Sequence, residues 1–296
     1  YLVSELSQGG RFEVGKTVFI AFSPERVDPG NARFGTRNTP KVLGGVTPAC
    51  MQVSQALYKN VVDTVVPVSS PDAAEMAKLL ENTFRAVNIG LVNEFALICS
   101  RLGLDVWEII GAAATKPFGF MPFYPGPGLG GHCIPIDPLY LSWKMRGLKM
   151  PARFIELADV VNTGMPDHVV TLTIDALNGD GKALKGAKVL VAGVAYKRDI
   201  SDVRESPAID VMHGLLAKGA QLSYLDPWVP SFKEHGLAYT SVPADVKYSD
   251  YDAVIIITDH KSIDFGRVCR EAKLIVDTRN ATRPYLAEAK ARIVRL

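Results

Sequence analysis

The residues best suited to chemistry lie in an unusual loop, YPGPGLGGHCIPIDP, at residues 124–138, which holds four glycines, four prolines and Cys133. A cysteine sulfur is a nucleophile when it is held as a thiolate. Small residues such as Gly130 and Gly131 let backbone or a substrate come close to that sulfur. A structural turn around an inert thiol is the alternative, and the loop alone leaves both interpretations open.

The same loop formally matches the dinucleotide-binding pattern GxGxxG at Gly126, Gly128 and Gly131. That fingerprint requires a strand before it and a helix that opens directly after it, whereas prolines stand on both sides here. We therefore do not predict a dinucleotide site in this loop. His132 adjoins Cys133, but neighbouring side chains usually diverge, so a Cys–His pair is not predicted either.

Two further groups of polar residues could act in a site. Lys78 and Asn82 are four residues apart and share a helix face, either as donors toward developing negative charge or as part of a solvated face. In FSPERVDPGN, a strand leads to Glu25, Arg26 and Asp28. This turn is either catalytic or a local salt-bridged loop.

The segment AYKRDISDVRESPA follows a strand and precedes a helix whose start is marked by Ser206 and Pro207. Its cations, Lys197, Arg198 and Arg204, could bind a phosphate together with the amino end of that helix. The sequence favours this function and a purely structural role equally.

The strand and helix patterns around these residues predict an α/β protein. Residues 1–70 alternate strand and helix patterns, which is typical of α/β packing. Residues 71–178 are predicted to be helical and to begin with one long amphipathic helix that runs to about Arg101. Gly164 and Pro166 predict a break or a kink in a later helix of this region.

Residues 179–296 contain continuous apolar strands joined by helices, which predicts a doubly wound parallel sheet covered on both faces. Such sheets bind ligands at the carboxyl ends of their strands. Four residues directly after predicted strands are therefore expected near a ligand: Lys197, Asp226, Asp259 and Arg279.

Composition limits the class of protein. The chain has 296 residues, 48% of them apolar and 22% charged, with a net charge of +2, which is typical of a globular protein and gives no sign of a nucleic-acid partner. The longest apolar runs are too short to span a membrane. The four cysteines show neither paired spacing nor zinc-ligand spacing, so we predict no metal and a reducing, cytoplasmic location. The first residue is Tyr, so we expect a fragment.

Five motifs in order resemble the UDP-glucose/GDP-mannose dehydrogenase family over nearly the whole chain: FSPERVDPGN, AEMAKLLENTFRAVNIGLVNEFA, GPGLGGHCIPIDPLYL, VLVAGVAYKRDISDVRESPA and VDTRN. SPERVDPGN and GGHCIPIDP are most similar to the UDP-N-acetylglucosamine 6-dehydrogenase branch of that family. The UDP-glucose branch typically has GGxCFPKD, from which His132, Ile134 and Ile136 depart.

The resemblance implies an NAD-dependent, four-electron oxidation of the C6 alcohol of a UDP-sugar, UDP-N-acetylglucosamine, to the uronic acid, as in polysaccharide biosynthesis. Three alternatives stay open, namely UDP-glucose as substrate, UDP-N-acetylmannosamine as substrate, and a nucleotide-sugar-binding fragment without redox activity. The resemblance also implies a homodimer or larger homo-oligomer built on the long helix. It makes residues 1–70 the remnant of an N-terminal NAD-binding domain, 71–178 a dimerisation and catalytic region, and 179–296 a UDP-sugar-binding domain.

The resemblance assigns catalytic roles to five residues. Cys133 would be the nucleophile that traps an aldehyde as a thiohemiacetal, which is then oxidised to a thioester and hydrolysed. Lys78 and Asn82 match the lysine and asparagine that face the oxyanion. Asp137 matches an acid that assists proton transfer or water, and Glu25 matches a glutamate of the hydrolytic step.

The resemblance assigns binding roles to five further residues. Lys197 and Arg279 match basic residues that contact the nucleotide sugar, next to Gly130 and Gly131 of the cysteine loop. Arg204 matches a residue near the NAD cofactor. Pyrophosphate recognition by such cations is physically sensible because charge-assisted hydrogen bonds are strong and directional.

Overall fold

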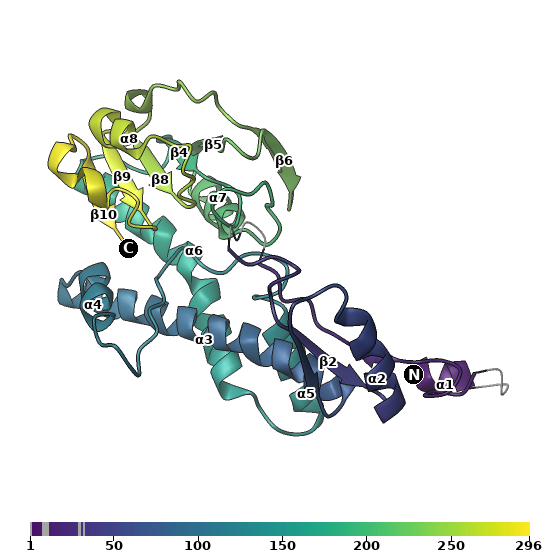
Figure 1. Ribbon diagram of the computed structural model, residues 1–296. Helices are drawn as coiled ribbons and strands as arrows, with labels where there is room; N and C mark the ends of the chain where they lie inside the picture. The colour runs from purple at the N-terminus through teal and green to yellow at the C-terminus, as the bar shows by residue number, and fades with distance from the viewer. Residues whose placement is uncertain (1, 8–11, 29–30, 32) are drawn as a thin grey trace. The chain divides into compact units, whose positions relative to one another are not determined.

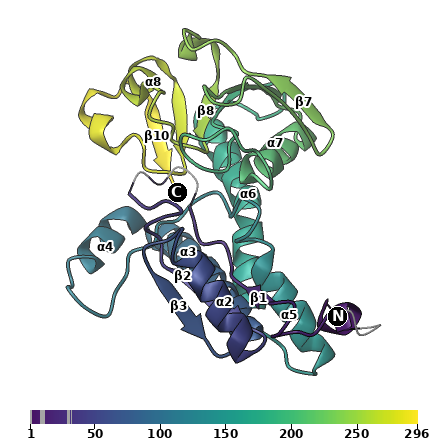
Figure 2. The same cartoon turned by 45° about the vertical axis from the view of Figure 1, so that its right-hand side comes forward.

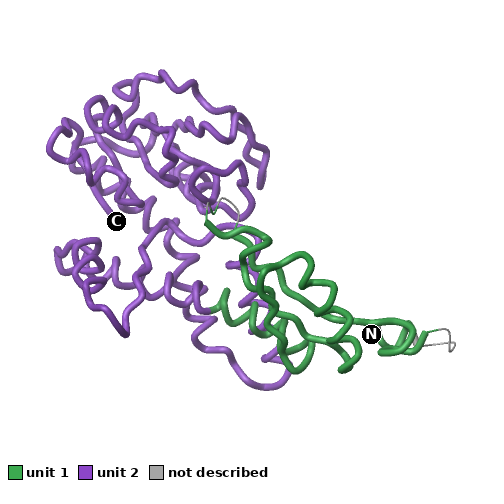
Figure 3. Tube along the Cα trace, viewed as in Figure 1, with its two compact units in different colours: residues 1–83 green, residues 84–296 purple. Residues whose placement is uncertain are grey.

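The computed structural model of the chain describes residues 2–7, 12–28, 31 and 33–296 (Figure 1). The chain divides into two compact units, Tyr1–Thr83 and Phe84–Leu296 (Figure 3). Part of the sequence motif SPERVDPGN, namely Pro29 and Gly30, lies outside the described residues.

The first unit holds a small three-stranded sheet in the order β1-β2-β3, in which β2 and β3 are parallel and β1 is antiparallel to β2. Thr47 starts the helix that crosses between the parallel strands, because its side chain accepts the backbone N–H of Cys50. The predicted strand over residues 17–22 is shorter than expected and is formed only at β1. The elements are α1 (Leu2–Ser7), β1 (Ala21–Phe22), β2 (Lys41–Gly45), α2 (Pro48–Tyr58) and β3 (Val65–Val68).

The long helix predicted from the apolar periodicity is confirmed as α3 (Pro71–Leu102). Gly103, with φ of +68°, ends it in the left-handed region that favours glycine. The next helix, α4 (Val106–Ala113), begins at the predicted cap, because the Asp105 carboxylate accepts the backbone N–H groups of Trp107 and Glu108.

Two more helices follow the cysteine loop, α5 (Asp137–Gly147) and α6 (Arg153–Gly179). The helix α6 continues through Gly164 and Pro166, so the predicted break is wrong. Pro166 removes a single helical hydrogen bond, since it has no N–H to donate, and the turns on either side keep the helix intact.

The rest of the second unit is built on five parallel strands in the order β10-β9-β8-β4-β5 (Figures 1 and 2). The first strand in the sequence, β4, lies inside the sheet, with β5 on one side and β8, β9 and β10 on the other. The order therefore reverses between β4 and β8, which is where open α/β sheets bind ligands. The strands are β4 (Lys188–Ala192), β5 (Gln221–Leu225), β8 (Ala253–Ile256), β9 (Leu274–Asp277) and β10 (Arg292–Arg295).

Helices cover both faces of this sheet, which confirms the predicted doubly wound fold. Val189 and Val191 belong to the apolar core formed with α6 and α7 (Pro207–Ala217). Leu190 and Ala192 belong to the opposite core, formed with α8 (Phe265–Glu271). Alternate residues of one strand thus enter different cores, so every residue of the strand is apolar after the first.

Several shorter elements were not predicted from the sequence. They are the hairpin β6 (Ser231–Glu234) and β7 (Leu237–Thr240), the 3-10 turns η1 (Tyr248–Asp250) and η2 (Arg283–Glu288), the strand β10 and the helix α1. In the part of the chain that is described, no helix is long and apolar enough to cross a membrane. The same residues contain no group of three or more His, Cys, Asp or Glu that could hold a metal ion.

The two-sided burial of β4 predicts a large effect of one core substitution. Leu190 is fully buried, so Leu190→Ala should lower the free energy of unfolding by about 2–5 kcal/mol, through lost apolar burial and the cavity left behind. Urea unfolding measures this change. The matched substitution Leu286→Ala, at a side chain that is 42% exposed, should lower it by less than about 1 kcal/mol. Equal losses in the two variants would contradict this packing.

Candidate active site beside the glycine loop

The glycine loop that carries Cys133 is packed against the segment that follows β4. A Cβ atom at Gly130 would lie 2.6 Å from Cβ of Tyr196 and 2.9 Å from the carbonyl oxygen of Glu205. Gly131 has φ of +88°, donates its N–H to the carbonyl oxygen of Arg204 at 3.1 Å, and lies under the Tyr196 ring. Glycine is therefore required at both positions to let two chain segments come together.

A buried amide network holds the start of the same loop. The Asn93 side-chain oxygen on α3 accepts the Gly126 N–H at 2.9 Å, and its amide group donates to Asn162 of α6 at 2.8 Å. Asn162 in turn donates to the carbonyl oxygen of Ala86 at 3.1 Å. Gly126 also faces Arg279, whose Nη1 would lie 2.6 Å from a Cβ at this position. The loop thus packs on the sheet domain, which is not the strand–turn–helix context of a dinucleotide fingerprint.

Cys133 stands directly ahead of α5, and its carbonyl oxygen accepts the N–H groups of Ile136 and Asp137 at 3.2 and 2.8 Å. Its sulfur is half-buried and lies 4.0 Å from Nδ1 of His132. The expectation that these neighbouring side chains diverge is therefore wrong. Asp137 lies in the first turn of α5.

Arg204 brings positive charge to the same place. Its Nε and Nη2 atoms bind the Asp202 carboxylate at 2.7–3.1 Å, and this bond is the main cause that lowers the pKa of Asp202. The pKa of Arg204 is raised, chiefly by Asp202 and to a smaller extent by Tyr196 and Cys133. An exposed guanidinium thus lies within electrostatic reach of the Cys133 sulfur.

A second cluster of cations lies at the carboxyl ends of β4, β8 and β9. Arg279, directly after β9, donates from Nε to the carbonyl oxygen of Ile257 at 2.7 Å. Desolvation, with a smaller contribution from the charge of Arg198, lowers the pKa of Arg279 to about 10, and Asp277 opposes that shift. Arg279 therefore stays cationic at neutral pH, although Arg198, which is paired with Asp259, lies near it.

Asp226, predicted to lie near a ligand, is buried, and its carboxylate is hydrogen-bonded to other residues of the protein. Its Oδ2 atom accepts the N–H groups of Val194 and Ala195 at 2.9 and 3.0 Å and contacts Nε2 of His260 at 3.1 Å. Burial raises the pKa of Asp226, but the bonds from His260 and the two backbone N–H groups together outweigh burial and lower it. Asp226 follows β5 directly, as predicted, but its carboxylate is buried and bound by the protein, and its place near a ligand stays a prediction.

In the first unit, two predicted catalytic residues meet. The Lys78 Nζ atom donates to the backbone carbonyl oxygen of Glu25 at 2.7 Å. The Glu25 carboxylate accepts the N–H of Val27 and the Nζ of Lys41, and the Val27 bond is the largest cause of its lowered pKa. Arg26 binds both carboxylate oxygens of Glu81.

Glu25 and Arg26 are thus in ion pairs, but with the distant residues Lys41 and Glu81 rather than with each other, so both interpretations of this turn stay predictions. Asn82 follows Lys78 by one turn of α3. The catalytic roles of both residues stay predictions, as do those of Cys133 and Asp137.

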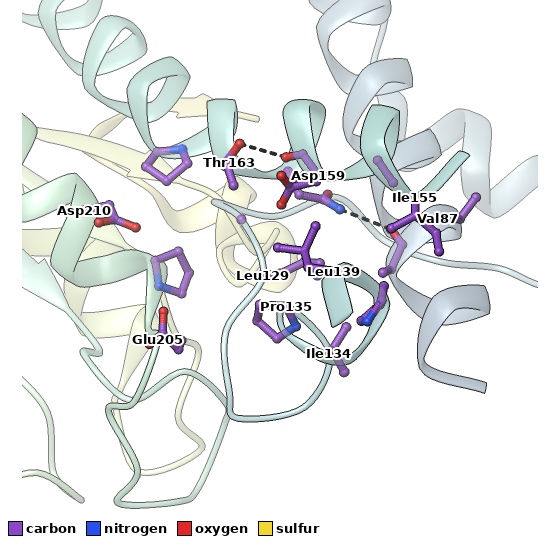
Figure 4. Close-up of a pocket in the computed structure, with 17 residues that line it drawn as sticks. Val87, Leu129, Ile134, Pro135, Leu139, Ile155, Asp159, Thr163, Glu205 and Asp210 are labelled. Carbon is purple, nitrogen blue, oxygen red and sulfur yellow. Dashed lines mark hydrogen bonds between the residues drawn. The ribbon is translucent and has the colours of Figure 1, made fainter. Parts of the chain in front are cut away.

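A cavity of about 120 Å³ lies between the cysteine loop, α3, α6 and the start of α7 (Figure 4). Its wall is largely apolar, with Ile134 and Pro135 of the loop and three acids, Asp159, Glu205 and Asp210. Burial raises the pKa of both aspartates. Ligand pockets have about 300–1,000 Å³, so a nucleotide sugar does not fit here. Sequence analysis missed this cavity because its lining comes from four distant segments.

The switch point, the cations around it and the packed cysteine loop belong to an open α/β domain of the kind that binds ligands at the carboxyl ends of its strands. Comparison with known proteins gives the family. Residues 72–164 match the model of the UDP-glucose/GDP-mannose dehydrogenase family, central domain, and residues 190–284 match that of the same family's UDP binding domain. The chain belongs to the UDP-glucose/GDP-mannose dehydrogenase family.

Individual relatives agree with this assignment. The chain is 34% identical over 275 residues to the UDP-N-acetyl-D-mannosamine dehydrogenase of Methanococcus maripaludis, covering 90% of this chain and 62% of that protein. It is 34% identical over 262 residues to the UDP-N-acetyl-D-glucosamine 6-dehydrogenase of Pseudomonas aeruginosa, and this match covers 87% of this chain and 60% of that protein. The solved structure of a UDP-D-ManNAc dehydrogenase from Pyrococcus horikoshii superposes with a TM-score of 0.84 at 29% identity, covering 99% of this chain and 68% of that one. The chain thus spans about three fifths of the length of these curated relatives.

The docking of the loop predicts opposite effects of two glycine substitutions. Gly130→Ala should lower the free energy of unfolding by about 1–3 kcal/mol, because its methyl group collides with Tyr196 and with backbone. The control Gly164→Ala has open space around the added methyl group inside α6 and should raise stability by about 0.5–1 kcal/mol. Urea unfolding of both variants decides the matter, and a Gly130→Ala protein as stable as the wild type would contradict the packing.

Proposed function

We propose that the chain forms the catalytic and UDP-binding parts of an enzyme that oxidises the C6 alcohol of a UDP-N-acetylhexosamine to a carboxylate, with two NAD consumed in succession. One observation carries this proposal. The loop that bears Cys133 packs against the chain segment that follows β4, at the switch point where cations gather.

Electrostatics favour a diphosphate at that edge of the sheet. Arg198 and Arg279 are close enough to repel each other, and part of the lowered pKa of Arg279 comes from Arg198. An anion between them would relieve this repulsion, and guanidinium groups bind phosphate oxygens in a bidentate manner. Lys197 stands in the same segment, five residues after the end of β4. We assign the diphosphate of the UDP-sugar to Lys197 and Arg279, with Gly130 and Gly131 beside it.

Cys133 supplies the covalent chemistry in this proposal. After the first oxidation has produced the C6 aldehyde, the sulfur adds to the aldehyde carbon and the carbonyl electrons move to oxygen, which gives a thiohemiacetal. Oxidation of the thiohemiacetal, with the hydride acceptor that bound NAD would supply, would release the hydroxyl proton and leave a thioester on Cys133. Attack by water would then break the C–S bond and give the acid and the free sulfur of Cys133.

NAD, when bound, would supply the hydride acceptor for both oxidations. Among the described residues Arg204 is our candidate for contact with it, since its exposed guanidinium stands beside the cysteine loop. The glycines of that loop are not expected to form a dinucleotide fingerprint, because Gly126 packs against Arg279, Gly128 against Pro207 and Gly131 against Tyr196.

The remaining catalytic groups of the proposal are those that the resemblance to the family implies. Lys78 and Asn82 lie one turn apart on α3. We propose that they stabilise the oxyanion that forms with the thiohemiacetal and the oxyanion that forms when water attacks the thioester. Glu25, whose backbone binds Lys78, is proposed to act in the hydrolytic step. Asp137 is proposed to assist proton transfer, since it follows Cys133 by four residues at the start of α5.

The choice of sugar rests on relatives. The motifs SPERVDPGN and GGHCIPIDP favour UDP-N-acetylglucosamine, and the relative from Pseudomonas aeruginosa is named for that substrate. Relatives from Methanococcus maripaludis and Yersinia pestis are named for UDP-N-acetyl-D-mannosamine, which makes this epimer the second candidate.

We also propose that the enzyme is a homodimer or a larger homo-oligomer. Exposed apolar residues follow one another on α3 at steps of three, four or seven, so they form one stripe along the helix: Phe84, Leu91, Phe95, Ile98 and Leu102. A stripe of this length is typical of a surface covered by a partner. A cytoplasmic location and a role in polysaccharide biosynthesis remain parts of this proposal.

The diphosphate site predicts a loss of UDP affinity in one variant. Arg279→Met should weaken the binding of UDP by between about tenfold and a hundredfold, the equivalent of one charge-assisted hydrogen bond. Isothermal titration calorimetry measures it, with Arg283→Met as the matched control, since Arg283 is exposed in η2. UDP affinity that is unchanged in Arg279→Met would remove Arg279 from the site.

The covalent role of Cys133 predicts loss of turnover without loss of binding. In the full-length enzyme, Cys133→Ser should bind UDP as the wild type does but form no uronic acid, because the serine hydroxyl is a far weaker nucleophile. NADH absorbance and product analysis are followed with the UDP-linked forms of N-acetylglucosamine, N-acetylmannosamine and glucose. Wild-type turnover in Cys133→Ser would exclude the thioester route. Binding of UDP without NADH formation from any of the three sugars in the wild-type enzyme would favour a binding protein.

A further inference from the structure

A buried histidine that the proposed chemistry does not use lies behind the cation cluster. His260 follows β8 and, like the Asp226 side chain beside it, has no solvent exposure. Burial of a polar pair requires that its hydrogen bonds be made within the protein. The hydrogen-bond partners of His260 and Asp226 therefore show which part of the chain this pair fixes.

The pair holds both ends of the segment that carries the cations. Asp226 accepts the N–H groups of Val194 and Ala195 at the start of that segment, at 2.9 and 3.0 Å. At its other end, the N–H of Asp199 donates to Nδ1 of His260 at 2.9 Å. Between these anchors stand Tyr196, Lys197 and Arg198.

The hydrogen bonds also fix the tautomer of His260. Because Nδ1 accepts from the Asp199 N–H, it carries no proton, and Nε2 must then donate to the Asp226 carboxylate. Neutral His260 thus connects the turns after β4, β5 and β8. Each of its ring nitrogens performs one of these two tasks.

The end held by His260 is a strained position. Asp199 has φ of +60°, in the left-handed region that a non-glycine residue adopts only at some cost in free energy. Its N–H bond to His260 and its carboxylate bonds to Lys261 oppose that cost. Without the imidazole acceptor, the N–H of Asp199 is left without this partner, and the turn has reason to relax.

We propose that His260 is a positioning residue that, through Asp226 and Asp199, sets the conformation in which residues 194–199 present Lys197 to the diphosphate. This role rests on the proposed function, since it concerns the same binding edge, but His260 itself contacts no substrate. The same segment presents Tyr196 to the glycine loop, so His260 acts on the Cys133 loop as well.

Two substitutions each remove one of the two hydrogen bonds of His260. His260→Asn keeps an acceptor near Asp199 but does not reach Asp226, and His260→Gln reaches Asp226 but cannot also accept from Asp199. Thr173→Val is the control, because it removes a fully buried hydroxyl from α6, away from this segment. The measurements are the affinity for UDP by calorimetry and the hydrogen exchange of residues 194–199 by mass spectrometry, both well below the melting temperature of each variant.

We expect both His260 variants to bind UDP about tenfold more weakly, the equivalent of one lost hydrogen bond, with faster exchange over residues 194–199. In the full-length enzyme KM for the UDP-sugar should rise more than kcat falls. Thr173→Val should be destabilised with unchanged UDP affinity, which separates positioning from general loss of stability. UDP affinity equal to that of the wild type in both His260 variants would overturn the positioning role alone, whereas a wild-type protein that does not bind UDP would overturn the proposed function.

Discussion

The contact on which the site depends is the close approach of Gly130 and Gly131 to Tyr196 and to the backbone of residues 204 and 205. A side chain at either glycine would separate the cysteine loop from the sheet domain. Because the loop is held there, Cys133 is fixed relative to the strand ends. A nucleophile placed in this way can form its bond without a further loss of conformational entropy.

The carboxyl edge of the sheet supplies the opposite half of the site. Arg279 is desolvated, its Nε atom donates to the carbonyl oxygen of Ile257, and a second guanidinium lies close to it, while the charge of Asp277 offsets part of its positive charge. The acids nearby are occupied, Asp259 by Arg198 and Asp226 by His260 and backbone. This arrangement leaves a net preference for an anion at the switch point between β4 and β8.

Most of the fold could be predicted from the sequence, because the strands β4, β8 and β9 are continuously apolar and α3 and α6 have strong helical periodicity. The hairpin of β6 and β7 was missed because its strands have four residues each and little apolar alternation. For the candidate site, the resemblance to the family assigned roles in one site to Cys133, Arg204 and Arg279. The inward turn of Asp226, the approach of His132 to Cys133 and the role of His260 depend on loop conformations. Sequence spacing does not determine these conformations.

The central claim is that the nucleotide sugar lies along the carboxyl edge of the second unit's sheet with its C6 atom at Cys133. A crystal structure of the full-length enzyme with a UDP-sugar tests it most directly. The account predicts the diphosphate in contact with Lys197 and Arg279, and the C6 carbon in van der Waals contact with the Cys133 sulfur. A diphosphate bound elsewhere, or a C6 atom separated from the sulfur by protein, would contradict it.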